Sequence, residues 1–147
     1  MEIESDVMNF TSMFKSYTDS TMRVNSQRII VLGMGGSGIS GDIASALCDT
    51  TSAIQVTSWK DYGLPKWATK NDSVICISYS GNTEETLSAA QKAIELGCDV
   101  AAITTGGVLE KIITDYGGEV TKIEAGHQPR AALPLLLTPL LEKIGIN

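Results

Sequence analysis

The sequence has few of the residues on which disulfide frameworks and metal centres depend. Its 147 residues include three cysteines, widely spaced and without a CxxC pair, and one histidine, His127. This inventory argues against both a disulfide framework and a zinc site. We therefore expect no metal ion in the protein, and a reducing, cytoplasmic setting for it.

Positive charge and long apolar runs are scarce as well. Eleven lysine and arginine residues against seventeen aspartate and glutamate residues give a formal net charge of −6, which repels nucleic acid and anionic membranes. No apolar run approaches the length of a membrane span, and the acidic amino terminus lacks the pattern of a secretory leader. We expect neither nucleic acid nor a membrane as a partner. An anionic ligand would have to be held by helix N-termini, backbone amides and hydroxyls.

What the sequence does contain is a regular alternation of strand and helix patterns. Short apolar runs predict strands at residues 28–32, 54–59, 74–78, 100–103 and 121–123. Helical spacing predicts helices at residues 39–47, 84–96, 109–116 and 130–144, and an extra leading helix at residues 5–18. This alternation is typical of a doubly wound α/β fold, because parallel strands need helical crossovers. We expect a five-stranded parallel sheet in flavodoxin-like order.

The length of the chain fits one domain over residues 1–147. Its α/β core would occupy residues 28–147, behind a leading helix and connection at residues 1–27. Near the carboxyl end, residues 131–141 are apolar almost all round, which is more than a surface helix shows. We expect a second domain, a second copy of the chain or a separate partner to cover that helix. Pro134 fits its first turn, whereas Pro139 should kink or end it.

The first chemically informative segment is a glycine-rich turn directly after the first predicted strand. Residues 33–38 read Gly-Met-Gly-Gly-Ser-Gly, so the backbone can turn tightly and present amides to an anion. Gly35, Gly36 and Ser37 are the candidate ligand-binding residues of this turn. Read as GxGxxG the segment would suggest a dinucleotide, but the next strand ends in Ser58 and Trp59 without the acidic residue that such sites use. We expect no cofactor.

A second turn follows the strand at residues 74–78 and leads into a helix. Three hydroxyl residues, Ser78, Ser80 and Thr83, surround Gly81 there. Hydroxyls and amides at a helix N-terminus bind phosphate oxygens without any basic residue. Ligands of doubly wound sheets lie beyond the carboxyl ends of the strands, so the two turns together predict one phosphate site.

Simpler explanations remain open for both turns. Thr83 is a good N-cap residue, and the two glutamates after it form an ordinary acidic first turn. A glycine-rich turn between a strand and a helix also occurs without any ligand. The N-cap explanation does not account for Ser78, Ser80 and Gly81.

Several segments together resemble one known family. Residues 33–42, 61–65, 77–86 and 129–132 look like those of the bifunctional phosphoglucose/phosphomannose isomerases, within the sugar isomerase (SIS) domain superfamily. The resemblance implies a hexose 6-phosphate ligand and isomerisation of glucose or mannose 6-phosphate to fructose 6-phosphate through a cis-enediolate. It places Gly36 and Ser37 in the sugar-phosphate site and implies that Arg130 stabilises the enediolate, a role that suits a permanent positive charge.

The resemblance covers only the first half of those two-domain isomerases. The family's glutamate base and ring-opening histidine belong to the other half, so catalysis would need a second SIS domain or a homodimer. Glu84 and Glu85 would stand beside the phosphate and make poor bases. His127 is more readily explained as a solvated loop histidine than as a catalytic group. A different hypothesis is that the chain is a stand-alone, non-catalytic sugar-phosphate sensor or regulatory module.

Overall fold

The computed structural model describes residues 28–51, 54–128 and 132–145. The leading helix expected at residues 5–18 and the expected catalytic residue Arg130 lie outside these ranges. Both remain predictions.

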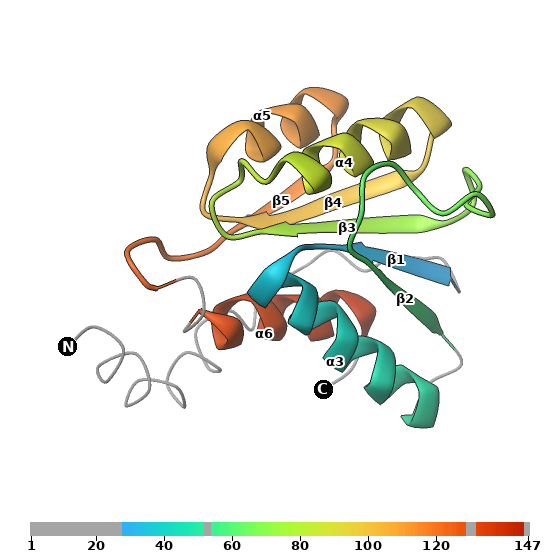
Figure 1. The fold of residues 1–147 in the computed structure, drawn as a ribbon, viewed down its shortest axis with the longest axis horizontal. Helices are drawn as coiled ribbons and strands as arrows, with labels where there is room; N and C mark the ends of the chain where they lie inside the picture. The colour runs from blue at the N-terminus through green and yellow to red at the C-terminus, as the bar shows by residue number, and fades with distance from the viewer. Residues whose placement is uncertain (1–27, 52–53, 129–131, 146–147) are drawn as a thin grey trace.

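Within the described residues, five parallel strands form one sheet in the order β2-β1-β3-β4-β5. In chain order the elements are β1 (Arg28–Leu32), α3 (Gly35–Thr51), β2 (Gln55–Trp59), β3 (Ser73–Ser78), α4 (Glu84–Leu96), β4 (Asp99–Thr104), α5 (Gly107–Tyr116), β5 (Glu119–Lys122) and α6 (Leu133–Ile144). Helices α4 and α5 cover one face of the sheet, and α3 and α6 cover the other (Figure 1). The predicted doubly wound α/β fold and its flavodoxin-like strand order are confirmed.

Both faces of the sheet are buried, which explains the continuous apolar runs in the strands. Ile29 and Val31 of β1 belong to a core cluster with α3 and α6, whereas Ile30 and Leu32 belong to a cluster with α4 and α5. Successive side chains of a strand point to opposite faces, so one short strand supplies both cores. The central strand β3 is buried at every position.

Several boundaries differ from the predictions. Helix α3 begins at Gly35, inside the glycine-rich turn, and strand β5 begins at Glu119 rather than at residue 121. Helix α6 does not end at Pro139 but continues to Ile144, while Pro134 occupies its first turn as predicted. Proline removes one backbone hydrogen bond from a helix interior. The burial of α6 on nearly all sides offsets this loss.

The apolar helix α6 is already covered within the single chain. Leu135, Leu136 and Leu140 are almost completely inaccessible to solvent. Even Lys143 is buried, with its Nζ 3.4 Å from Oε1 of Glu119 in β5. Burial lowers the pKa of Lys143, and the Glu119 carboxylate opposes this shift. The composition of α6 therefore gives no separate evidence for a partner that covers it.

An ion pair fastens the amino end of the sheet to the loop between β2 and β3. Arg28 Nε and Nη2 lie 2.6 and 2.7 Å from the two carboxylate oxygens of Asp72. The carboxylate also accepts a hydrogen bond from the Thr69 N–H, and the Arg28 guanidinium lies over the Trp67 ring. The Arg28 hydrogen bond is the main cause of the lowered pKa of the buried Asp72.

Replacing Asp72 with asparagine should lower the free energy of unfolding at pH 7 and weaken its dependence on acid. A lowered folded-state pKa means that the stabilisation is complete above the ordinary aspartate pKa, about 3.9, and is lost as the pH falls below it. Urea unfolding between about pH 2.5 and 7 measures this, with the exposed Asp115→Asn as the control. An unchanged acid dependence in Asp72→Asn would contradict the assignment.

Candidate functional site

The glycines in the first turn and just after it have two different roles. A Cβ on Gly41, just beyond the turn, would lie 2.8 Å from Ser58 Oγ in β2, so this glycine lets α3 pack closely against the strand. Gly35, by contrast, has open space where a Cβ would stand and a positive φ of 54°. Together with Gly36 and Ser37 it lines a cavity at the start of α3. Because the first amides of a helix lack partners within it, this stretch can donate hydrogen bonds to a ligand.

The second turn holds its three hydroxyls in one hydrogen-bonded cluster. Ser78 Oγ lies 2.9 Å from Thr83 Oγ1 and 3.5 Å from Ser80 Oγ. It also accepts a hydrogen bond from the Gly81 N–H, and Ser80 Oγ accepts one from the Asn82 N–H. Ser78 is fully buried, whereas Ser80 is exposed and Thr83 is half-buried. The buried Ser78 hydroxyl therefore stabilises the conformation of the turn through these hydrogen bonds, whereas Ser80 and Thr83 are the hydroxyls that a ligand can reach.

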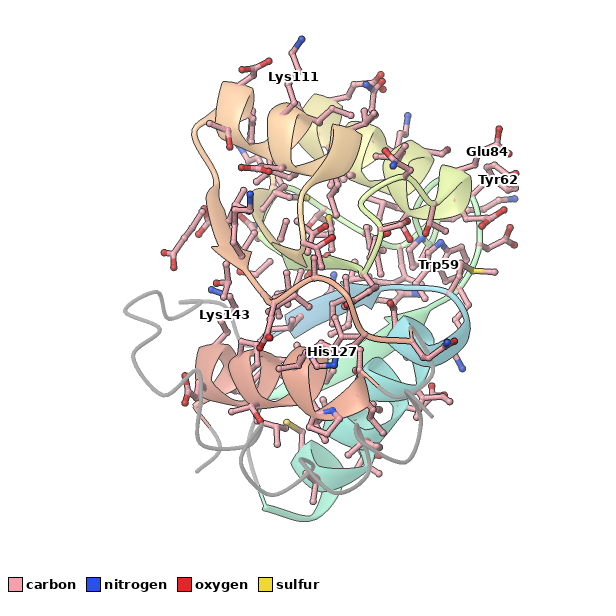
Figure 2. The ribbon with its side chains drawn as sticks, turned by 90° about the vertical axis from the view of Figure 1, so that its left-hand side faces the viewer. Trp59, Tyr62, Glu84, Lys111, His127 and Lys143 are labelled. Carbon is pink, nitrogen blue, oxygen red and sulfur yellow. The ribbon has the colours of Figure 1, made fainter. Side chains whose placement is uncertain are left out.

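Thr83 is the residue before α4, but its side chain does not act as a helix cap. Its backbone is extended, with φ −68° and ψ 118°, yet the hydroxyl makes no capping hydrogen bond and instead contacts Ser78. Glu84 and Glu85 form the acidic first turn of α4, and the Tyr62 hydroxyl lies 3.3 Å from Oε2 of Glu84 (Figure 2). The simple N-cap explanation thus accounts for the glutamates but not for the hydroxyl cluster.

The two turns meet at one cavity of about 390 Å³. It is lined by Met34, Gly35, Gly36, Ser37, Tyr79, Ser80 and Thr83. Neighbouring parallel strands β1 and β3 end at the same edge of the sheet, and this brings the turns together. The sequence correctly predicted that the two turns lie together.

The end of β2 lacks the acidic residue of a dinucleotide site. The strand ends at Trp59, whose indole N–H donates to the Gly63 carbonyl, and no residue of the strand is acidic.

A third turn, between β4 and α5, supports the second one. The Leu109 N–H donates to the Gly81 carbonyl, and the Val108 N–H donates to Oδ1 of Asn82, so the β3–α4 turn caps the start of α5. Gly81 has a φ of +76°, and a Cβ there would overlap the carbonyl oxygen of Gly106. Sequence reasoning missed this role of Asn82 and Gly106. In the sequence, the two adjacent glycines after β4 were the only indication of this contact between turns.

Among the described residues, none of the seven that line the cavity is acidic or basic. Lys60 lies near the glycine-rich turn, with its side chain over Gly38, but its ammonium group pairs with Asp42 and lowers the pKa of that carboxyl. A ligand in the cavity would therefore meet amides, hydroxyls and helix N-termini, the devices expected of an acidic protein that binds an anion.

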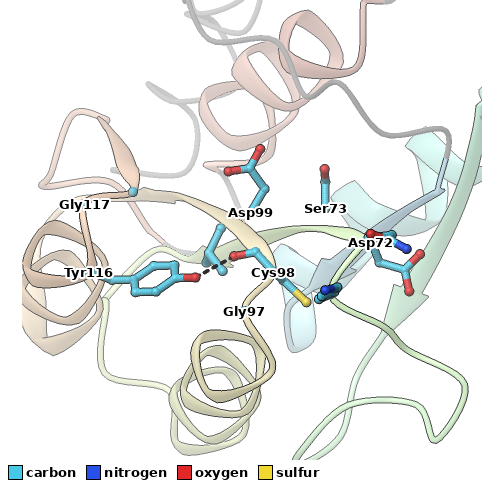
Figure 3. A pocket seen from close by; sticks show the side chains of 11 residues that line it. Asp72, Ser73, Gly97, Cys98, Asp99, Tyr116 and Gly117 are labelled. Atoms are coloured by element: carbon cyan, nitrogen blue, oxygen red, sulfur yellow. Dashed lines mark hydrogen bonds between the residues drawn. The ribbon is translucent and has the colours of Figure 1, made fainter.

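A larger cavity, about 520 Å³, lies at the opposite, amino end of the strands (Figure 3). Some of its polar groups already have partners: the Tyr116 hydroxyl donates to the Cys98 carbonyl, and the Cys98 thiol donates to the Thr69 carbonyl. The Asp72 carboxylate is paired with Arg28. Ligands of doubly wound sheets bind at the other, carboxyl edge of the sheet.

The remaining predicted groups are placed as follows. His127 lies in the loop between β5 and α6, beside the start of α6 (Figure 2), and its side chain is only 15% exposed. The expectation of a solvated loop histidine was therefore wrong. In the part of the chain that the structure describes, no three histidine, cysteine, aspartate or glutamate side chains gather as metal ligands. No helix there is long and apolar enough to span a membrane.

The fold and the site together define the class: a doubly wound α/β domain with a cavity where the β1–α3 turn and the β3–α4 turn meet at the carboxyl edge of the sheet. Comparison with known proteins makes the class specific. Residues 23–108 match the SIS domain, and the chain belongs to that family.

Relatives and solved structures agree with this assignment. The chain is 41% identical over 145 residues to a bifunctional phosphoglucose/phosphomannose isomerase of Thermoplasma acidophilum, covering 95% of this chain and 44% of the relative. A protein of the same name from Caldicellulosiruptor bescii is 43% identical over 114 residues, covering 78% and 34%. The solved tagatose-6-phosphate ketose/aldose isomerase of Escherichia coli shares the fold, with a TM-score of 0.68 at 15% identity, covering 98% and 43%. The chain thus spans less than half the length of these proteins.

Gly81→Ala should destabilise the chain more than a substitution at another glycine of positive φ. Gly63 is the matched control, since its φ is +63° but nothing lies within 4 Å of a Cβ placed there. Gly63→Ala should cost only the conformational strain, about 1–2 kcal/mol. Gly81→Ala adds the overlap with Gly106 and disturbs the start of α5. Urea unfolding compares the two, and equal losses would contradict the close approach described above.

Proposed function

We propose that the chain binds a hexose 6-phosphate, with its phosphate in the cavity between the two turns. The observation that carries this proposal is the convergence of the Ser80 and Thr83 hydroxyls with the start of α3 on one cavity. Each helix N-terminus favours an anion by about 0.3–1 kcal/mol when exposed. Two such termini, α3 and α4, flank the site.

We further propose that the bound sugar phosphate is the substrate of an aldose–ketose isomerase of which this chain supplies the phosphate-binding half. The relatives named phosphoglucose/phosphomannose isomerases support this proposal. The match covers 44% of the Thermoplasma acidophilum relative, which supports the view that this chain corresponds to one half of such an enzyme. Arg130, by the family resemblance, would stabilise the enediolate oxyanion. Proton abstraction beside a carbonyl needs a positioned base, and we place that base in a second SIS domain. The cytoplasmic setting is part of the proposal, and it is supported by the three cysteines, which form no disulfide.

Calorimetric titration with fructose 6-phosphate tests the binding site. We expect saturable binding that fructose does not reproduce and that falls at least about a hundredfold in Ser80→Ala/Thr83→Ala, since hydrogen bonds to a charged group contribute about 1.5–3 kcal/mol each. Thr114→Ala, which removes an exposed hydroxyl from α5, is the control and should bind normally. Binding that survives loss of both hydroxyls would contradict the proposed site.

A turnover assay tests whether the catalytic base lies outside this chain. The chain alone should not interconvert glucose 6-phosphate and fructose 6-phosphate, because it lacks the proposed base. Joined to the remainder of a two-domain relative, or mixed with it, the chain should support turnover that Arg130→Lys greatly lowers. Turnover by the chain alone would show that the base lies within these 147 residues and would contradict the proposal.

A further inference from the structure

The cavity between the two turns has apolar lining residues as well as polar ones. Glycine, serine and threonine make up five of its seven lining residues and offer amides and hydroxyls. The other two are Met34 and Tyr79, which follow the ends of the neighbouring parallel strands β1 and β3. A phosphate is held by amides and hydroxyls and gains little from a thioether or an aromatic ring. These two side chains therefore have no role in binding the phosphate itself.

Met34 lines the cavity without contributing to the hydrophobic core. Its side chain is half-buried. Among the described residues, it belongs to neither of the two core clusters, although Leu32, two residues earlier, is a core residue. The Met34 carbonyl accepts a hydrogen bond from the Gly38 N–H at 3.2 Å, a role that any side chain would allow. Methionine is unbranched and adapts to the shape of what it contacts, so Met34 can pack against a ligand.

Tyr79, by contrast, is held rigidly at the edge of the cavity. Its hydroxyl accepts a hydrogen bond from the His127 N–H at 2.8 Å and donates one to the Glu124 carbonyl at 3.2 Å. The Tyr79 carbonyl accepts hydrogen bonds from the Thr105 hydroxyl at 2.6 Å and the Thr105 N–H at 3.2 Å. The ring packs against the core cluster on the α3 and α6 side of the sheet. Since the hydroxyl bonds to protein groups, Tyr79 brings a fixed aromatic ring to the cavity.

We propose that Met34 and Tyr79 are specificity-determining residues that contact the carbon skeleton of the ligand, so that the site selects a phosphate ester over inorganic phosphate. This inference rests on the proposed function and names the chemical class of ligand that the same cavity takes. The cavity volume of about 390 Å³ lies within the range of small-molecule pockets, about 300–1,000 Å³. Such pockets combine apolar walls with a few polar groups that fix the orientation of the ligand.

The chemistry of a hexose 6-phosphate fits this division of the cavity. Its phosphate is joined through oxygen to a methylene carbon, and the next carbon carries a hydrogen. These uncharged C–H groups can pack against a thioether and an aromatic ring while the phosphate oxygens accept hydrogen bonds from Ser80 and Thr83. Inorganic phosphate lacks the C–H groups and would use only the polar side of the cavity.

Met34→Ala tests the inference by calorimetric titration with two ligands, fructose 6-phosphate and inorganic phosphate. Burial of one methylene group is worth about fourfold in affinity. We therefore expect affinity for fructose 6-phosphate to fall about four- to fifteenfold, and affinity for inorganic phosphate to change less than about twofold. Met34→Leu restores apolar volume and should bind fructose 6-phosphate more tightly than Met34→Ala. Tyr79→Ala, once urea unfolding shows that it folds, should give the same selective loss.

Leu96→Ala is the matched control, because it also truncates a partly exposed apolar side chain, but at the end of α4 and outside the cavity. It should change neither affinity. If the wild-type chain binds fructose 6-phosphate and Met34→Ala binds it as tightly, the inference is wrong. Equal weakening of both ligands would assign Met34 to the phosphate site and would also overturn it. If the wild-type chain does not bind fructose 6-phosphate, the proposed function itself fails.

Discussion

The site depends on the close backbone contact between the β3–α4 turn and the β4–α5 turn. Gly81 and Gly106 approach so closely that no side chain fits at Gly81. This contact lets Gly81 and Asn82 cap the start of α5. It also fixes the turn on which Ser78, buried beneath, aligns the Ser80 and Thr83 hydroxyls. The geometry of the ligand groups is thus set by packing and not by the ligand.

The proposed anion site lies in an acidic chain, and the fold explains how an anion can be held there. The net charge of −6 repels an anion at long range. At short range the amides at the starts of α3 and α4 and the hydroxyls between them provide partial positive charge at the edge of the sheet where strands β1 and β3 end. These groups are the ones that the proposed site offers to a phosphate. Residues that act on the sugar itself can then come from other loops, or from the other half of a two-domain protein.

Much of this could be predicted from the sequence, because the determining signals are local. The strand order follows from the alternation of strands and helices, and α4 was predicted to the residue from its apolar spacing and from Gly97, which adopts the left-handed conformation that ends the helix. The contact of Gly81 with Gly106 and the bridge from Tyr79 to residues 124–127 could not, since each joins segments far apart in the chain. Local patterns also failed at Pro139, where burial of α6 outweighs the loss of a helical hydrogen bond.

The most direct test of the account is a nuclear magnetic resonance titration of isotopically labelled chain with fructose 6-phosphate. The account predicts that the largest shifts occur at the amides of residues 35–37 and 80–83, where the two turns meet, and that Gly97 and Gly117 beside the larger cavity stay unchanged. Shifts centred on Gly97 and Gly117, or saturation without any change at residues 80–83, would contradict it.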